Sequence, residues 1–218
     1  WPAPAWMRVV SSRPEERGER VKLLVATTNA GKLAELRRLF AGLPVELVSL
    51  ADVPIDRHVD EDADTFEGNA CKKASTFALR SGLPTLADDS GLEVDALGGA
   101  PGVRSARYAG ESATDEQNLR KLVDAIRGHA DRGARFRCAL ALAQPSGAIA
   151  HVTDGRCEGS IIDEPRGERG FGYDPVFVLD GDTRTMAELN EDEKNGRSHR
   201  GAASRAMRSY LEQVLRAQ

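Results

Sequence analysis

Two adjacent carboxylates, Asp88 and Asp89, stand between apolar runs at residues 83–87 and 92–97. This pattern predicts a buried strand that enters a turn at Ser90 and Gly91. Side chains alternate between the faces of an extended segment, so the two acids point opposite ways and are not predicted to share one proton. We expect one to face a cleft, where it suits a metal ion or a water nucleophile, and the other to anchor the turn. A capped turn with solvated acids is the alternative.

The composition limits the class of protein. The chain has 218 residues, 40% hydrophobic and 29% charged, which is enough to bury a core as one large domain or two small ones. A net charge of -4 argues against a general nucleic-acid or anionic-membrane binder. Three scattered cysteines without a CxxC pair fit a reducing compartment, and no apolar run approaches the roughly 20 residues needed to span a bilayer. We therefore expect a cytoplasmic protein that binds neither nucleic acid nor membrane.

The first twenty residues differ from the rest of the chain. They carry several prolines and many charges, and they lack the apolar core of a signal peptide. We interpret residues 1–20 as a loosely ordered N-terminal extension and residues 21–218 as a single domain.

A strand-to-helix turn is predicted near the start of that domain. Residues 21–28 form an apolar run, and apolar residues recur at helical spacing from Leu33 onward. The turn between them contains Thr27, Thr28, Asn29 and Lys32. Free N–H groups at a helix start, joined by a lysine, make a ready anion site, although the GxxxxGK[ST] pattern is absent. An ordinary capped helix is the alternative.

An acidic run precedes the next predicted helix. Residues 60–64 contain four carboxylates, and Thr65 is a plausible cap for an amphipathic helix over 66–79. One acid of the run is expected to reach Asp89 and share a cation with it. Because Lys72 and Lys73 are neighbours on the helix, only one of them is expected to face a cleft. A solvated loop and solvated lysines are the alternative.

The remaining pattern predicts an α/β fold, a mixed sheet flanked by helices rather than a purely parallel one. Further strands are expected at 45–50, 157–162 and 176–179, with a hairpin formed by 135–143 and 148–153. Residues 98–110 are expected to form a shaped glycine-rich loop. Further helices are expected at 114–127 and 186–194, the latter broken by Asn195-Gly196, and a last helix follows Ser198.

Two more segments suggest a ligand. Phe171 and Tyr173 alternate with glycines before a strand, which suits a platform that stacks on a flat ring, with Asp174 accepting from ring N–H groups. His199 and Arg200 occupy the first turn of the last helix, where the helix dipole disfavours positive charge. Such cations are more often placed for a ligand than for stability.

Together these segments resemble the inosine triphosphate pyrophosphatase family. The resemblance rests on ATTNAGK at 26–32, TFEGNA at 65–70 with Lys73, ADDSG at 87–91, GGAPG at 98–102 with SARY at 105–108, GFGYDP at 170–175, and Lys194 with SHRG at 198–201. It spans residues 22 to about 215, in the order and spacing of the family. It implies hydrolysis of a nucleoside triphosphate to the monophosphate and pyrophosphate. It also implies magnesium dependence, a homodimer, and an elongated α/β fold with the active site between two lobes.

The resemblance also implies roles for particular residues. Asp89 matches the general base or metal-bound carboxylate, Glu61 matches a metal-associated acid, and Ser90 contacts substrate. The triphosphate is held by Thr27, Thr28, Asn29, Ala30, Gly31, Lys32 and Lys73. The nucleobase pocket is formed by Phe171, Gly172, Tyr173, Asp174, Lys194, His199 and Arg200. One departure is Gly68, which stands where family members often carry a second acidic residue, so either Glu67 takes that role or a helper to the metal or water is missing.

The donor chemistry of the last helix favours 6-oxo purines. Arg200 only donates hydrogen bonds, and a protonated His199 likewise. Hypoxanthine and xanthine present an acceptor oxygen at C6, whereas adenine presents an amino donor, which leaves buried groups unpaired. An NTPase that releases the γ-phosphate and a non-catalytic nucleotide sensor remain alternatives.

Overall fold

The structure is a computed structural model that describes residues 20–216, so the predicted N-terminal extension lies outside the described residues except for Arg20. The helices and strands are β1 (Val21–Ala26), α2 (Ala30–Leu39), β2 (Val45–Ser49), α3 (Phe66–Ser81), β3 (Thr85–Val94), α4 (Asp115–Ile126), β4 (Gly133–Ala143), β5 (Ile149–Ile161), β6 (Phe177–Leu179), α5 (Glu191–Arg197) and α6 (His199–Arg216). None of these helices combines the length and the apolar composition needed to cross a membrane.

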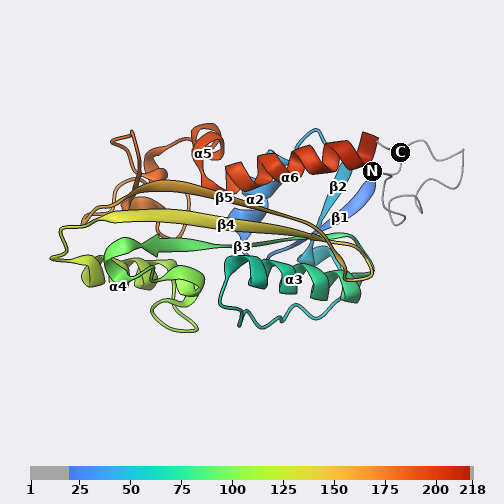
Figure 1. The fold of residues 1–218 in the computed structure, drawn as a ribbon, viewed down its shortest axis with the longest axis horizontal. Helices are drawn as coiled ribbons and strands as arrows, with labels where there is room; N and C mark the ends of the chain where they lie inside the picture. The colour runs from blue at the N-terminus through green and yellow to red at the C-terminus, as the bar shows by residue number, and fades with distance from the viewer. Residues whose placement is uncertain (1–19, 217–218) are drawn as a thin grey trace, which may run out of the picture.

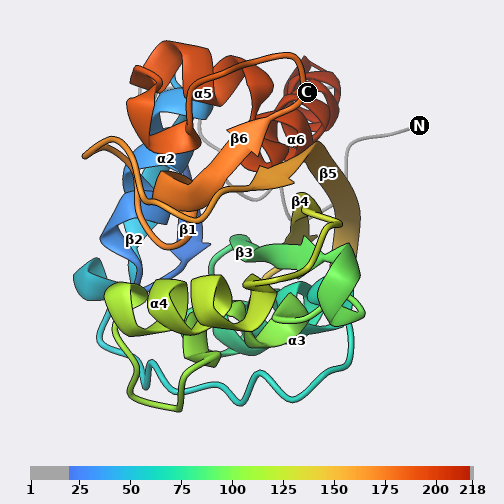
Figure 2. The ribbon, with the colours of Figure 1, turned by 90° about the vertical axis from the view of Figure 1, so that its left-hand side faces the viewer.

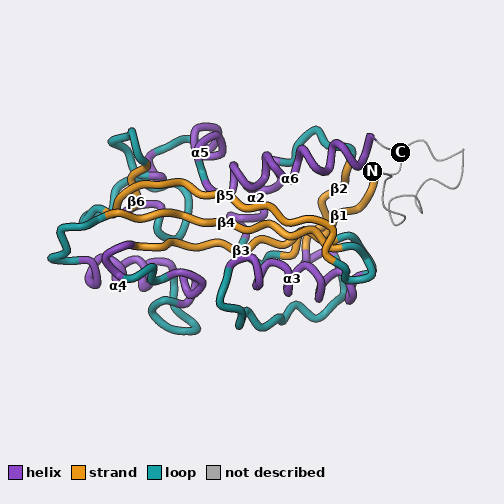
Figure 3. Tube along the Cα trace, viewed as in Figure 1, coloured by secondary structure: helices purple, strands orange, loops and turns teal. Residues whose placement is uncertain are grey.

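A mixed sheet forms the centre of the molecule, as predicted. Its six strands run in the order β2-β1-β3-β4-β5-β6 (Figures 1 and 3). Strand β1 pairs in parallel with both β2 and β3, whereas β3, β4, β5 and β6 pair antiparallel. The short chain reversal at 144–148 makes β4 and β5 a hairpin, and the helical crossovers make β2, β1 and β3 parallel.

Helices cover the sheet from both sides, with α2, α5 and α6 on one side and α3 and α4 on the other (Figure 2). The pleat of β3 and β4 sorts alternate residues between these layers. Leu86 packs with α2 and α6, whereas Ala87 packs with α3. Because this alternation continues along β3, Asp88 points toward α2 and α6, and Asp89 points toward α3. The two carboxylates do face opposite sides of the sheet.

Strand β3 outruns its parallel neighbour. Strand β1 pairs only as far as Ala26, opposite Ala87, but β3 continues to Val94. The edge of β3 beyond Ala87 therefore has no strand beside it on the β1 side until the segment 100–105 covers it, where the Leu92 N–H donates to the Ser105 Oγ and the Val94 N–H to the Ala100 carbonyl. A crevice at the carboxyl end of a strand, where a neighbouring strand ends, is the usual place for a ligand in such sheets.

The predicted Ser-Gly turn was wrong. Strand β3 runs straight through it because β4 pairs with every residue from Thr85 to Val94. Gly91 is needed for close approach instead. A Cβ there would lie 2.4 Å from the Ser105 Oγ and 2.6 Å from the Gly102 carbonyl oxygen.

Two other boundaries also differ from the prediction. The segment 157–162 is not a separate strand, because β5 continues without interruption from the hairpin to Ile161. Asn195-Gly196 does not break a helix, since both residues lie inside α5. The break comes earlier, between a 3-10 turn at Met186–Glu188 and Asn190, which caps α5 by accepting the Glu193 N–H. The predicted loop at 98–110 is partly regular, with a 3-10 helix over Gly102–Arg107.

Candidate active site

The start of α2 lies at the crevice opened by the end of β1. Asn29 is the N-cap and accepts the Lys32 N–H at 3.0 Å, and the Thr27 Oγ1 accepts the Asn29 N–H at 3.1 Å. The two polar side chains shape the turn at the start of α2. The anion site predicted here stays a prediction. Lys32 itself bends back and pairs with Asp88.

Asp88 is a buried ionic centre that joins β3, α2 and α6. It is 2% exposed and accepts from the Arg200 Nε and from the Cys138 Sγ, each at 3.1 Å. Burial opposes its ionisation, but Arg200 and Lys32 outweigh burial and hold its pKa well below the usual range. Asp88 therefore stays ionised at any physiological pH. It orders the two cations and does not anchor a turn.

Asp89 has different surroundings. Its Oδ1 accepts from the Lys73 Nζ at 3.1 Å, and its Oδ2 accepts from the Asn69 Nδ2 at 3.1 Å. Burial, joined by the nearby carboxylates of Glu61 and Asp88, raises the pKa of Asp89 to about 6 against the pull of Lys73 and Lys32. A carboxylate with such a pKa can take up a proton near neutral pH.

Glu61 lies beside Asp89, and Lys73 stands between the two carboxylates. The Glu61 Oε2 is 3.2 Å from the Lys73 Nζ, and this cation, against the effect of burial, keeps the pKa of Glu61 low. Lys72 turns away and pairs with Asp62 at 2.6 Å. Of the two adjacent lysines only Lys73 enters the site, and of the acidic run Glu61 is the residue that reaches Asp89.

The predicted nucleobase residues gather on the other side of β3, around Lys194. The Lys194 Nζ lies 2.6 Å from an Asp174 oxygen and 2.7 Å from a Glu35 oxygen. Phe171 is half-buried, with the Lys194 Nζ 4.8 Å from its ring centre. The ring leans on Gly31, where a Cβ would lie 2.6 Å from it. Arg200 also lies near this ring, 5.7 Å from its centre, so two cations are attracted to the electron-rich face of Phe171.

Tyr173 has a different role from the one predicted. It is only 4% exposed and belongs to the hydrophobic core around α4 and β6, and its hydroxyl donates to the Ser105 carbonyl at 2.8 Å. Of the two aromatics, Phe171 is the stacking surface. Asp174 is buried beside it, and its Oδ2 accepts from both Lys194 and the Phe171 N–H.

His199 is neutral, contrary to the protonated form that the donor argument assumed. Burial, together with the positive charge of Arg200, holds its pKa well below the usual value. The ring stacks on Phe136 with 4.7 Å between centres, and its Nδ1 lies 3.8 Å from the Cys157 Sγ. The imidazole therefore has one donor and one acceptor nitrogen. Arg200 is the group that only donates.

The two groups of residues line adjoining cavities. One, of about 360 Å³, contains Thr27, Thr28, Glu61, Lys73 and Asp89 in its wall. The other, of about 90 Å³, contains every residue predicted for the nucleobase. Asn29, Lys32 and Ser90 line both cavities. Of the remaining predicted residues, Ala30 lies in the helix start outside both walls, and Gly31 lines a neighbouring hollow with Glu35 and Arg38.

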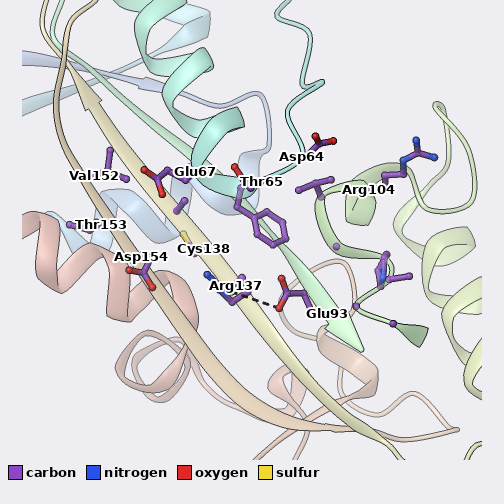
Figure 4. Close-up of a pocket in the computed structure, with 18 residues that line it drawn as sticks. Asp64, Thr65, Glu67, Glu93, Arg104, Arg137, Cys138, Val152, Thr153 and Asp154 are labelled. Atoms are coloured by element: carbon purple, nitrogen blue, oxygen red, sulfur yellow. Dashed lines mark ion pairs between the residues drawn. The ribbon is translucent and has the colours of Figure 1, made fainter. Parts of the chain in front are cut away.

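A larger cavity of about 810 Å³ lies elsewhere (Figure 4). It is bounded by the start of α3, the loop at 98–104 and strands β4 and β5, and in it Glu93 and Arg137 form an ion pair at 3.9 Å. None of the predicted site residues lines it. We therefore place the candidate active site in the two smaller cavities, where the carboxylates with shifted pKa values lie.

The carboxylate pair suits a magnesium ion that shares its ligands with a substrate. Mg²⁺ typically takes one or two carboxylates and completes its shell with phosphate oxygens and waters. Glu61 and Asp89 supply two carboxylates that converge on one cation, the Lys73 Nζ. Within residues 20–216, no group of three or more His, Cys, Asp or Glu side chains would hold a metal without such help.

Several functional residues were not found from the sequence. Glu35 accepts from the Arg200 Nη1 at 2.5 Å as well as from Lys194, yet it looks like a polar residue on an amphipathic helix. In the sequence, the one indication of a role for Glu35 is its position one turn after Gly31, on the helix face that also carries Lys32. Asn69 and Phe136 were hidden in the same way inside a helix and a strand pattern.

Known proteins match this chain over most of its length. The profile of the Ham1 family matches residues 23–210. The dITP/XTP pyrophosphatase of Geobacter sulfurreducens is 50% identical over 192 residues, which cover 87% of this chain and 96% of that protein. The dITP/XTP pyrophosphatase of Syntrophobacter fumaroxidans is 50% identical over 198 residues, covering 91% and 85% of the two chains.

Solved structures agree. A HAM1 protein from Coxiella burnetii superposes with a TM-score of 0.81 at 40% identity, covering 88% of this chain and 99% of that one. A nucleoside-triphosphatase / dITP/XTP pyrophosphatase from Mycobacterium abscessus superposes with a TM-score of 0.70 at 44% identity, with coverage of 88% and 99%.

Proposed function

This chain belongs to the Ham1 family, and on that premise we propose that it hydrolyses non-canonical purine nucleoside triphosphates (ITP, dITP and XTP) to the monophosphate and pyrophosphate. Relatives that carry the name dITP/XTP pyrophosphatase support the substrate class. We include in the proposal a magnesium requirement and a cytoplasmic homodimer, both of which the family resemblance supports.

One observation carries the proposal. The residues shared by the two cavities, Asn29, Lys32, Ser90 and Ala106, lie between the carboxylate pair and the donor-lined aromatic pocket. A nucleotide with its base against Phe171 directs its phosphates across these residues toward Asp89. The helix start and the two lysines then meet the triphosphate charge.

Asp89 is the residue best placed to handle the proton of the attacking water. Its raised pKa, near 6, gives it more proton affinity than an ordinary carboxylate while leaving it mostly ionised at neutral pH. Lys73 holds one of its oxygens and Asn69 the other, so its direction is fixed before substrate binds. A magnesium ion held by Glu61, Asp89 and phosphate oxygens would neutralise charge on the triphosphate.

Selectivity comes from an excess of donors in the base pocket. Arg200 is held on three sides, by Asp88, Glu35 and Ser90, and keeps further N–H groups for a ligand. Of the acceptors near it, both Glu35 oxygens and the Asp174 Oδ2 already receive hydrogen bonds. A 6-oxo purine offers an acceptor to this surface, whereas the 6-amino group of adenine adds another donor and leaves buried groups unpaired.

The test is a product assay with ITP and ATP in parallel, with magnesium and then with a chelator. Magnesium-dependent pyrophosphate from ITP, with little from ATP, is the expected result. Orthophosphate in place of pyrophosphate would assign attack to the γ-phosphorus, and tight ITP binding without any product would make the protein a sensor. Sedimentation analysis of the full chain checks the dimer.

A further inference from the structure

The first turn of α3 contacts the loop that carries Glu61. Asn69, in that turn, is 0% exposed. Its Oδ1 accepts the Ala63 N–H at 2.9 Å, and its Nδ2 lies 3.4 Å from the Ala63 carbonyl oxygen. The same Nδ2 donates to the Asp89 Oδ2 at 3.1 Å. One buried amide therefore joins the Glu61 loop to the proposed general base.

The loop depends on such contacts because it has no regular secondary structure between residues 53 and 65. On the other side, the Arg107 Nη2 donates to the Glu61 carbonyl at 2.7 Å. Glu61 is thus held at its own carbonyl by Arg107 and, two residues later, at Ala63 by Asn69. These two contacts set where the Glu61 carboxylate meets Lys73 and Asp89.

Gly68 provides the space for this arrangement. A Cβ at Gly68 would lie 2.8 Å from the Ala63 Cβ and 3.0 Å from the Thr65 Oγ1. The glycine that replaces an expected acid therefore lets Ala63 approach α3 closely enough for Asn69 to bind it.

We propose that Asn69 is a positioning residue that fixes Glu61 relative to Asp89, and that Gly68 leaves the space that Ala63 needs for its contact with Asn69. The proposal rests on the proposed function, since it assigns these two residues to the geometry of the same site. Two carboxylates of like charge do not stay together unless neighbouring groups hold them. Displacements of about 1 Å in a catalytic group can cost about 100-fold in rate. The three hydrogen bonds of Asn69 therefore affect the rate more than their number suggests.

A pair of substitutions at Asn69 separates its two contacts. Asn69→Leu removes both, whereas Asn69→Asp keeps an acceptor for Ala63 and replaces the donor to Asp89 by a carboxylate. We expect kcat for ITP to fall roughly 10- to 100-fold in both variants, with KM within about threefold of wild type. Hydrogen exchange of the Ala63 amide, measured without nucleotide or metal, should accelerate in Asn69→Leu and stay slow in Asn69→Asp. Near-normal kcat in Asn69→Asp would show that Asn69 only anchors the loop and would overturn the proposal.

Gly68 gives a second test. Alanine favours a helix interior by about 1 kcal/mol over glycine, which offsets part of the strain of the new Cβ against Ala63 and Thr65, so Gly68→Ala should stay folded in a thermal melt while kcat falls. Ala63→Gly in the same chain removes the opposing Cβ and should restore most of the rate. A Gly68→Ala enzyme with full activity, or a double variant whose kcat is not restored, would count against this role of Gly68.

Thr185→Val is the matched control. The Thr185 hydroxyl is equally buried and donates to the Arg166 carbonyl at 2.7 Å, in a part of the fold that lines neither cavity of the candidate active site. The Thr185→Val variant should have a lower melting temperature than wild type and an unchanged kcat. If wild type makes no pyrophosphate, the proposed function fails; if wild type is active and the Asn69 variants match it, this inference alone fails.

Discussion

Asp88 and Asp89 are neighbours in one strand, yet they build two different kinds of site. Asp88, on the α6 side, is matched by Arg200 and Lys32, and its pKa is held low. Asp89, on the α3 side, stands near another carboxylate, and its pKa is raised to about 6. One half of the candidate site is a fixed ionic frame, which we propose serves recognition, and the other holds the carboxylate that we propose transfers the proton. The pleat of a single strand keeps the two environments apart.

The largest effect is expected from Asp89→Asn. The amide keeps the shape and cannot accept a proton, so turnover should fall roughly 10²- to 10⁴-fold with the fold intact. Asp95→Asn, which removes a partner of Arg135 at 2.7 Å outside the site, is the control. Steady-state kinetics with ITP at saturating magnesium give the measurement, and near-normal turnover would remove Asp89 from the role of base.

Asp88→Asn should instead affect stability. It leaves Lys32 without its carboxylate and Arg200 buried with only Glu35 as an ionic partner. Breaking a buried ion pair costs about 3–5 kcal/mol, so the urea midpoint should shift strongly downward. A stability within about 1 kcal/mol of wild type would mean that Asp88 does not hold the frame together.

Glu35→Gln should affect the recognition half alone. The variant keeps the volume of the side chain but weakens the hold on Arg200 and Lys194. We expect the ratio of kcat/KM for ITP over ATP to fall about tenfold, while kcat for ITP changes little. Glu46→Gln, on an exposed part of β2, serves as the control. An equal loss of kcat for both substrates would tie Glu35 to the chemistry instead.

The smallest effects concern pH. If Asp89 must be ionised, kcat/KM should fall with decreasing pH below about 6, approaching tenfold per unit. The stability of the fold should change with pH in the opposite direction. The folded pKa lies above the ordinary 3.8, so the stabilisation from the bound proton is complete below about pH 4 and is lost as pH rises through 6.

Asp89→Asn removes this loss. In metal-free buffer at pH 7.5 the variant should therefore be more stable than wild type, by roughly 1–3 kcal/mol. Thermal melts of both proteins between pH 4 and 8 make the comparison. Parallel curves would show that Asp89 does not titrate in this range.

Local patterns were enough to predict much of this molecule. A cap located α3 at Thr65, periodicity located α4, and the pleat separated the two aspartates. The predicted turn at Ser90 was wrong because pairing with β4, which no local pattern shows, keeps β3 extended. Glu35 was missed because its partners on α5 and α6 are brought to it only by the fold. The role of Tyr173 depended on the same distant packing.

The dependence of Asp88 and Glu35 on α6 has a consequence for synthesis. Arg200 reaches back 165 residues along the chain to Glu35 and 112 residues to Asp88. Chains are made and begin to fold from the N-terminus, so the proposed catalytic carboxylates emerge from the ribosome well before Arg200, to which we assign substrate choice. Until α6 docks, Asp88 lacks its arginine and the surrounding core lacks Met207 and Leu211. We expect incomplete chains to remain unstable, so that discrimination between purines is the last property the protein acquires and no long-lived unselective hydrolase precedes it.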